Sequence, residues 1–287
     1  MKKILLCTDG SAFAANIYRY GAWFATRLKA EVDVLCVTDI RSQQAIPIEN
    51  LSGSIGIDAS ENLLNRLVEL EHEKAKINHQ KAKLVLQEAT QTLKADGVDK
   101  INLLHETGFL VDCLEKFEAD CDLVTLGKRG ETASFASGRL GANLETIVRS
   151  SQKPCLVTSR QFKPIERVLI AYDGSPTGQK MLQFLVDFPL FQRLQLHLIT
   201  VTKNRAEPIA IARLHQAEQK FALAGLELVS HLLEGESEKA IAQYITEQDI
   251  SLLLMGAYGH SRIRHLVIGS TTAQILRSSP IPVLVFR

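Results

Sequence analysis

An internal repeat constrains this 287-residue chain more than any other feature of its sequence. Four segments recur in the same order in the two halves, and each is a short apolar run together with the turn or helix end beside it. The matched pairs are Lys3–Ser11 with Arg167–Ser175, Val32–Thr38 with Leu196–Thr202, Cys121–Gly127 with Ile250–Gly256, and Ile147–Val157 with Ile275–Val285. Four matches in one order indicate a duplicated domain. We therefore predict two domains, residues 1–160 and 165–287, with a linker near Gln161–Pro164.

Each copy alternates short apolar runs with helical patterns. The runs are apolar at nearly every position and rich in β-branched residues, which is typical of parallel strands covered by helices on both faces. Helical spacing follows the first run of each copy, at Ala14, Ile17, Tyr18, Gly21, Ala22 and Ala25 and at Met181, Leu182, Leu185 and Phe188. The sequence therefore predicts an α/β fold of two tandem, doubly wound parallel-sheet domains.

The copies differ in length after their second predicted strand. Asp9 and Gly127 are 118 positions apart and Asp173 and Gly256 are 83 apart, so the first copy has 35 extra residues. The first copy has a polar loop at Ser42–Ser60 and a long helical stretch from Glu61 to about Lys94, where the second has a short helix near Ala206–Leu223. The alternating charges of the long helix are typical of a solvated face, and a protein-binding role is the alternative.

Composition and charge exclude several classes of function. Hydrophobic residues make up 46% of the chain and charged residues 23%, so each half can bury a core. The net charge of +1 argues against nucleic-acid or membrane-surface binding, which needs a basic face. No apolar run approaches the roughly 18 residues that cross a membrane. We expect a cytoplasmic protein.

All five cysteines fall in the first copy, and none forms a Cys-x-x-Cys motif. Cys7, Cys36 and Cys155 lie inside strand-like runs, where a thiol usually packs as a small hydrophobic group. We expect buried structural thiols rather than redox or metal-binding groups.

The sharpest motif lies in the second copy, where Gly256 and Gly259 are followed after nine residues by Gly269, Ser270, Thr271 and Thr272. It follows the apolar run Leu252–Met255 and precedes a helical pattern. Glycines allow close approach of a ligand to the backbone, and the free N–H groups of a helix start attract anions. The loop between them adds positive charge through His260, Arg262, Arg264 and His265. The motif predicts a phosphate site, although turns and an ordinary helix cap are the alternative.

Asp173 ends the first predicted strand of the same copy, and Gly256 ends the fourth. Open α/β sheets bind ligands beyond the carboxyl ends of their strands, at the switch point between these two strands. The two residues should therefore be neighbours. A carboxylate there suits a ribose hydroxyl or a magnesium ion, while the Asp173–Ser175 turn can equally cap the first helix, and both roles are compatible.

On these residues the chain resembles the universal stress protein family in its tandem form, through Asp-Gly-Ser after the first strand and Gly-x2-Gly-x9-Gly-Ser after the fourth. The resemblance implies a Rossmann-like fold of the adenine nucleotide alpha hydrolase type and an ATP-binding, cytoplasmic stress-response regulator. It places the adenine near Val201, Asp173 at the ribose or Mg²⁺, and the phosphates at Gly256, Gly259, Gly269, Ser270 and Thr271. It also implies dimers paired through their last strands, which a tandem chain would form internally by bringing Leu156–Val157 near Leu284–Val285.

The first copy departs from this pattern. Gly127 and Gly130 are present, but ten residues separate them from Gly141, and Ala142 replaces the serine. With Asp9 and Val37, these glycines form at most a weaker second site. The sequence thus favours one strong nucleotide site, in residues 165–287.

Three functions remain open at this point. The first is a nucleotide-binding regulator with ATP and Mg²⁺ as ligands, as an intrachain pseudo-dimer or a homodimer with an unidentified protein partner. The second is a slow ATPase or nucleotidyl-transfer enzyme, for which we identify no general base beyond His260 and His265. The third is a scaffold that binds protein through the long helix and needs no nucleotide.

Overall fold

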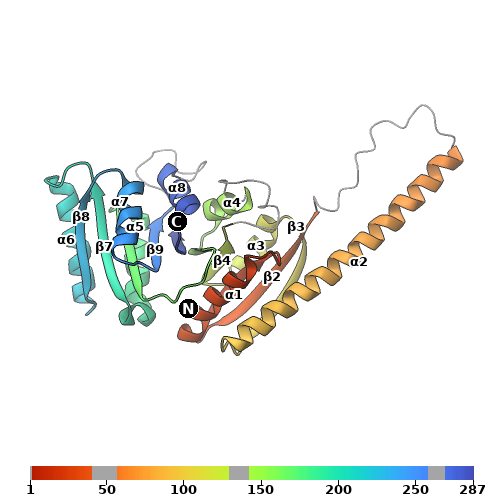
Figure 1. Ribbon diagram of the computed structural model, residues 1–287, viewed down its shortest axis with the longest axis horizontal. Helices are drawn as coiled ribbons and strands as arrows, with labels where there is room; N and C mark the ends of the chain where they lie inside the picture. Colours follow the sequence, from red (N-terminus) through yellow and green to blue (C-terminus); the bar gives the residue numbers. More distant parts are fainter. Residues whose placement is uncertain (1, 41–56, 129–141, 258–268) are drawn as a thin grey trace.

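The computed structural model describes residues 2–40, 57–128, 142–257 and 269–287 (Figure 1). The described part of the first half contains nine elements in strict alternation. They are β1 (Lys3–Thr8), α1 (Ala14–Leu28), β2 (Glu31–Asp39), α2 (Ile57–Ala95), β3 (Ile101–Gly108), α3 (Leu110–Glu118), β4 (Leu123–Gly127), α4 (Ala142–Ser150) and β5 (Cys155–Thr158). The predicted alternation of strands and helices is confirmed.

The second half repeats this order with one short 3-10 helix added. Its elements are β6 (Arg167–Ala171), α5 (Pro176–Asp187), η3 (Pro189–Arg193), β7 (Gln195–Thr202), α6 (Pro208–Leu223), β8 (Leu228–Glu234), α7 (Ser237–Glu247), β9 (Leu252–Gly256), α8 (Ser270–Ser278) and β10 (Val283–Phe286). The predicted difference after the second strand is present, because α2 has 39 residues and α6 has 16.

The described residues form one ten-stranded sheet with the order β3-β2-β1-β4-β5-β10-β9-β6-β7-β8. Within each half all pairs are parallel, and the first and fourth strands are neighbours, as the doubly wound prediction requires. The halves meet where β5 and β10 pair antiparallel, with Leu156 opposite Leu284 and Val157 opposite Val283. This is the edge-to-edge contact that the matched final strands predict.

The strands are apolar throughout because helices cover both faces of the sheet. Ile4 and Leu6 face one layer, with residues of α1 and the carboxyl-terminal part of α2, while Leu5 and Cys7 face the other, with residues of α3 and α4. Successive strand residues point to opposite faces, so both sets are buried. Because both faces of the strands are packed, the carboxyl ends of the strands are held in defined positions.

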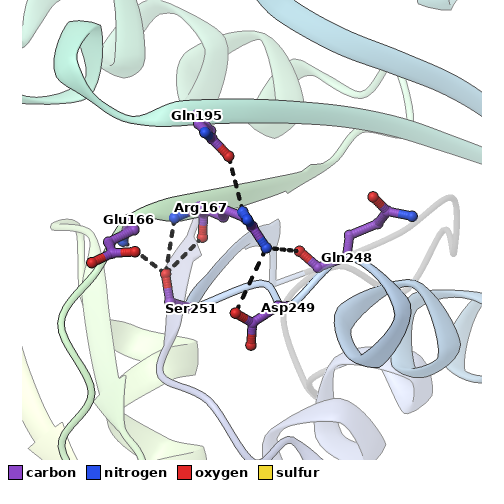
Figure 2. Close-up of polar contacts among 6 residues, drawn as sticks. All are labelled: Glu166, Arg167, Gln195, Gln248, Asp249 and Ser251. Atoms are coloured by element: carbon purple, nitrogen blue, oxygen red, sulfur yellow. Dashed lines mark hydrogen bonds and ion pairs between the residues drawn. The ribbon is translucent and has the colours of Figure 1, made fainter.

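In both halves, a side chain that accepts backbone hydrogen bonds holds the amino end of the first strand in place. Figure 2 shows Ser251, whose Oγ accepts hydrogen bonds from the backbone N–H groups of Glu166 at 2.9 Å and Arg167 at 3.0 Å. In the first half, Asp122 Oδ2 accepts from the backbone N–H groups of Lys2 at 2.5 Å and Lys3 at 3.1 Å. The opposite edge of the sheet is thus held in the same way twice.

Candidate functional site

The carboxyl ends of β6, β7 and β9 meet at one edge of the second domain. The backbone N–H of Tyr172 donates to the Ile199 carbonyl at 2.9 Å, and Thr200 Oγ1 donates to the Tyr172 carbonyl at 3.1 Å. These bonds hold Asp173 beside the end of β7, where Val201 lies. Ala171 pairs with Met255, the residue before Gly256. The structure therefore brings together the ends of the three strands that carry Asp173, Val201 and Gly256.

The Asp173 turn also caps a helix, as the second sequence interpretation held. Asp173 Oδ1 accepts from the backbone N–H of Ser175 at 2.9 Å, and the Ser175 hydroxyl accepts from the backbone N–H of Gly178 at 3.0 Å. Gly174 has φ +77°, the left-handed region that favours glycine. The turn leaves Asp173 half-buried at the sheet edge with one carboxylate oxygen held.

The two ends of the glycine motif are joined to each other. The backbone N–H of Gly269 donates to the Ala257 carbonyl at 3.2 Å, and Thr272 Oγ1 donates to the Gly256 carbonyl at 3.1 Å. The strand end and the start of α8 are therefore adjacent. Gly259 and the charged residues His260, Arg262, Arg264 and His265 lie outside the described residues.

The first turn of α8 contributes N–H groups that have no partner within the helix. Gly269 is the residue before the helix, with φ −53° and ψ 138°, so its backbone conformation does not itself require glycine. The first intrahelical bond runs from the Ala273 N–H to the Gly269 carbonyl at 2.9 Å, and the N–H groups of residues 270–272 precede it. Ser270 is exposed. The positive end of the helix dipole therefore lies beside the end of β9.

Glu238 of α7 is a residue at this site that sequence reasoning missed. Its Oε1 accepts a hydrogen bond from Thr271 Oγ1 at 3.1 Å, so the Thr271 hydroxyl is engaged within the protein. Thr271 can then offer a phosphate its backbone N–H but not this hydroxyl. The repeat gave no signal for Glu238, because the matching residue of the first copy is Val111.

Arg213 of α6 is a second residue that the motifs did not indicate. It is half-buried, and a Cβ placed on Gly174 would lie 2.6 Å from its Cδ and 2.8 Å from its Nε. Burial and the Asp173 carboxylate raise the pKa of the neighbouring Tyr172 hydroxyl, and the positive charge of Arg213 opposes this rise. A cation therefore lies over the turn that carries Asp173.

The first domain forms the same turn under a different cover. Asp9 Oδ1 accepts from the Ser11 N–H at 2.9 Å, and Gly10 has φ +70°. A Cβ on Gly10 would collide with Val85 of α2, which occupies the place of Arg213. Val37 lies in β2 and Gly127 ends β4, beside β1. Gly130 and Gly141 lie outside the described residues.

Cations from each domain reach the last helix of the other. Lys128, which follows Gly127, donates from Nζ to the Ser279 carbonyl just beyond α8. Arg287 Nη1 donates to the Ser150 carbonyl at the end of α4 at 2.6 Å. Burial, with a smaller effect from Arg160, lowers the pKa of the Lys128 ammonium to about 8. Both contacts suit the negative ends of helices.

The cysteines are buried, as predicted. All five are free thiols, and burial raises the pKa of Cys36 to about 11 and those of Cys121 and Cys155 to about 12. Among the described residues, no group of three His, Cys, Asp or Glu side chains could hold a metal ion. No helix in the described ranges is both long and apolar enough to span a membrane.

The geometry defines a class of tandem α/β proteins with two doubly wound domains that share one sheet. The family model of the universal stress protein family matches this chain twice, over residues 1–159 and 164–287. A universal stress protein of Synechocystis sp. is 58% identical to the chain over all 287 residues, the full length of both. The chain belongs to the universal stress protein family.

Solved structures share the fold. A universal stress protein from Archaeoglobus fulgidus has a TM-score of 0.70 at 24% identity, with 99% of this chain and 95% of that chain covered. A putative universal stress protein from Pseudomonas aeruginosa has a TM-score of 0.64 at 16% identity, with 99% of this chain and 92% of that chain covered. Both coverages extend over the two domains, so the tandem arrangement is shared.

Proposed function

We propose that this universal stress protein is a regulator that binds one ATP molecule in its second domain. The observation that carries the proposal is the convergence of the Asp173 turn, the end of β9 and the free N–H groups at the start of α8. Backbone N–H groups and a helix dipole suit phosphates, and a carboxylate two residues beyond β6 suits a ribose or Mg²⁺. Val201, at the end of β7, would lie against the adenine.

The described residues fit a nucleotide better than they fit rapid catalysis. Mg²⁺ usually binds through one or two carboxylates together with phosphate oxygens, so Asp173 and the nucleotide would share it. His260 and His265, the general-base candidates that the sequence offered, lie outside the described residues. We propose that ATP is held as a signal and turned over slowly at most, because the sequence offers no second acidic residue beside Asp173. A cytoplasmic location belongs to the proposal, supported by the five free thiols.

Mass spectrometry of nucleotide released from the purified protein, followed by titration calorimetry with ATP and Mg²⁺, tests the proposal. We expect bound ATP or ADP at close to one per chain. Ser270→Ala should weaken ATP binding by roughly 10- to 100-fold, because a hydrogen bond to a charged group is worth about 1.5–3 kcal/mol. Absence of nucleotide in both experiments would overturn the proposal in favour of a protein scaffold, and rapid ADP release would favour an enzyme.

A further inference from the structure

Helix α2 extends far beyond the body of the first domain (Figure 1). Its contacts with the core begin at Ala82 and continue through Val85, Leu86, Ala89 and Leu93, which are all buried. From residue 65 to residue 81, every side chain is exposed except Leu67 and Asn78, which are half-buried. Helices in water depend mainly on packing of an apolar face, so this projecting part lacks the stabilisation that the rest of α2 receives.

The projecting part and the turn after it carry an apolar stripe, formed by Leu67, Leu70, Ile77 and Leu84. Their spacings of three, seven and seven residues place them along one side of the helix. Leu70 is 48% exposed, Ile77 62% and Leu84 65%. At about 100° per residue, the stripe lies roughly 110° around the helix from the residues that pack on the core. It is therefore accessible to a second molecule while α2 stays docked.

Between Leu67 and Leu84 the charges of α2 are divided by sequence position. Glu69, Glu71 and Glu73 come first, and Lys74, Lys76, Lys81 and Lys83 follow. A parallel pair of such helices would place like charges side by side, whereas an antiparallel pair places the acidic turns of each against the basic turns of the other. The helix is thus complementary to a second copy of itself in one direction only.

The stripe selects the same antiparallel register. Aligning Leu70 with Ile77 of a second copy also sets Glu71 against Lys76 and Glu73 against Lys74 of that copy, with the two-fold axis between residues 73 and 74. The boundary between acidic and basic residues lies at the same place. The apolar pattern and the charge pattern therefore centre an antiparallel pair on the same point.

We propose that the apolar stripe of α2 is the surface through which two copies of the chain associate as an antiparallel, two-fold helix pair. The final strands β5 and β10 already pair within the chain, so that edge is not available to a second copy. The paired segment, residues 63–84, is about 33 Å long at 1.5 Å per residue. This is small for a protein interface, so the association should be reversible and concentration-dependent.

Sedimentation equilibrium of the full chain over a range of concentrations tests the association. Wild type should dimerise, and Ile77→Glu should weaken the dimer at least about 10-fold because it places a charge in the apolar contact. Leu223→Glu is the matched control, since Leu223 is 91% exposed on α6, away from the stripe. Monomeric wild type at all concentrations, or equal effects of the two substitutions, would overturn the proposal.

Charge exchange and cross-linking test the direction. The triple variant Glu69→Lys, Glu71→Lys, Glu73→Lys and the triple variant Lys74→Glu, Lys76→Glu, Lys81→Glu should each fail to dimerise alone and should pair when mixed. Leu70→Cys with Ile77→Cys should form disulfide-linked dimers, whereas Leu84→Cys alone should not. A parallel pair would cross-link in both variants and would contradict the antiparallel register, as would triple variants that do not pair when mixed.

Discussion

The two domains share a scaffold and differ in the side chain that covers the turn after their first strand. Both contain the same strand order and the same Asp-Gly-Ser turn, with a carboxylate that accepts the N–H two residues on at 2.9 Å. Over the glycine of that turn lies Val85 in the first domain and Arg213 in the second. An apolar side chain over the turn offers no attraction to an anion, whereas a guanidinium attracts phosphate or carboxylate.

The difference teaches where a duplicated domain can diverge. Strand residues such as Leu5 and Leu169 are fully buried, and a substitution there would disturb the whole sheet. The side chain over the turn after the first strand differs instead, with buried Val85 in one copy and half-buried Arg213 in the other. The comparison predicts that the two edges respond differently to the same substitution.

The largest expected effect comes from placing a side chain on the glycine before α8. Gly269→Val should reduce ATP affinity by at least about 100-fold, because a Cβ would intrude where backbone meets phosphate. Gly141→Val makes the matching change in the first domain and should alter ATP affinity little. Titration calorimetry of both variants decides between the domains. Loss of binding with Gly141→Val alone would assign the site to the first domain.

The buried carboxylate of Glu118 stabilises the first domain, whereas the matching carboxylate of the second domain is exposed. Glu118 Oε1 accepts from the backbone N–H groups of Gln152 at 2.5 Å and Lys153 at 3.1 Å, and from the Ser151 hydroxyl. Glu118→Ala should lower the free energy of unfolding by about 3 kcal/mol, because it leaves these donors unpaired. Its equivalent, Glu247, is exposed, and Glu247→Ala should cost less than about 0.5 kcal/mol in urea unfolding. Equal costs would show that the Glu118 contacts contribute little.

The cover over the Asp173 turn should contribute to affinity in the second domain. Arg213→Ala should weaken ATP binding by about 10-fold, corresponding to loss of roughly one charge-assisted contact. Arg193→Ala removes an exposed cation near the opposite edge of the sheet and serves as the control. Calorimetry at two salt concentrations should show a smaller salt dependence for Arg213→Ala. Unchanged affinity would limit Arg213 to a packing role.

A pH-dependent effect is expected at Lys128, whose counterpart in the second domain is the buried Ala257. The pKa of Lys128 is lowered to about 8 from 10.5, so the unfolded chain binds more protons between these values. The free energy of unfolding of the wild type, measured relative to that of Lys128→Met, should therefore rise as pH increases from 8 towards 10. Urea midpoints of both proteins at pH 7 and pH 9.5 measure this difference. A difference that stays constant with pH would place the Lys128 ammonium in a wetter environment.

Much of the fold could be predicted from the repeat and from the apolar runs. The parallel sheet, the adjacency of the first and fourth strands, and the long helix after β2 were all predicted, because each depends on local periodicity or on the rules of doubly wound sheets. The helix was expected over Glu61 to about Lys94 and spans Ile57–Ala95. The positions of Asp173 and Gly256 at adjoining strand ends followed from the same rules.

Other features of the site depend on contacts that no local pattern encodes. Glu238 and Arg213 reach the ligand edge from separate helices, and the engagement of the Thr271 hydroxyl depends on how α7 packs against α8. The capping role of Ser175 and the candidate role of Asp173 were both open in the sequence. The structure shows the cap directly, through the hydrogen bond from the Gly178 N–H.

The sequence by itself determined the duplication, the fold of each copy and the glycine motif, because these depend on residue type and on spacing along the chain. Tertiary structure decided the register in which the two final strands pair, which side chains cover the turn after each first strand and which parts of α2 lie on the core. Those properties depend on distances between residues far apart in sequence, such as Leu156 and Leu284, or Gly174 and Arg213. Such distances are set only when helices and strands pack together and bury their shared apolar surface.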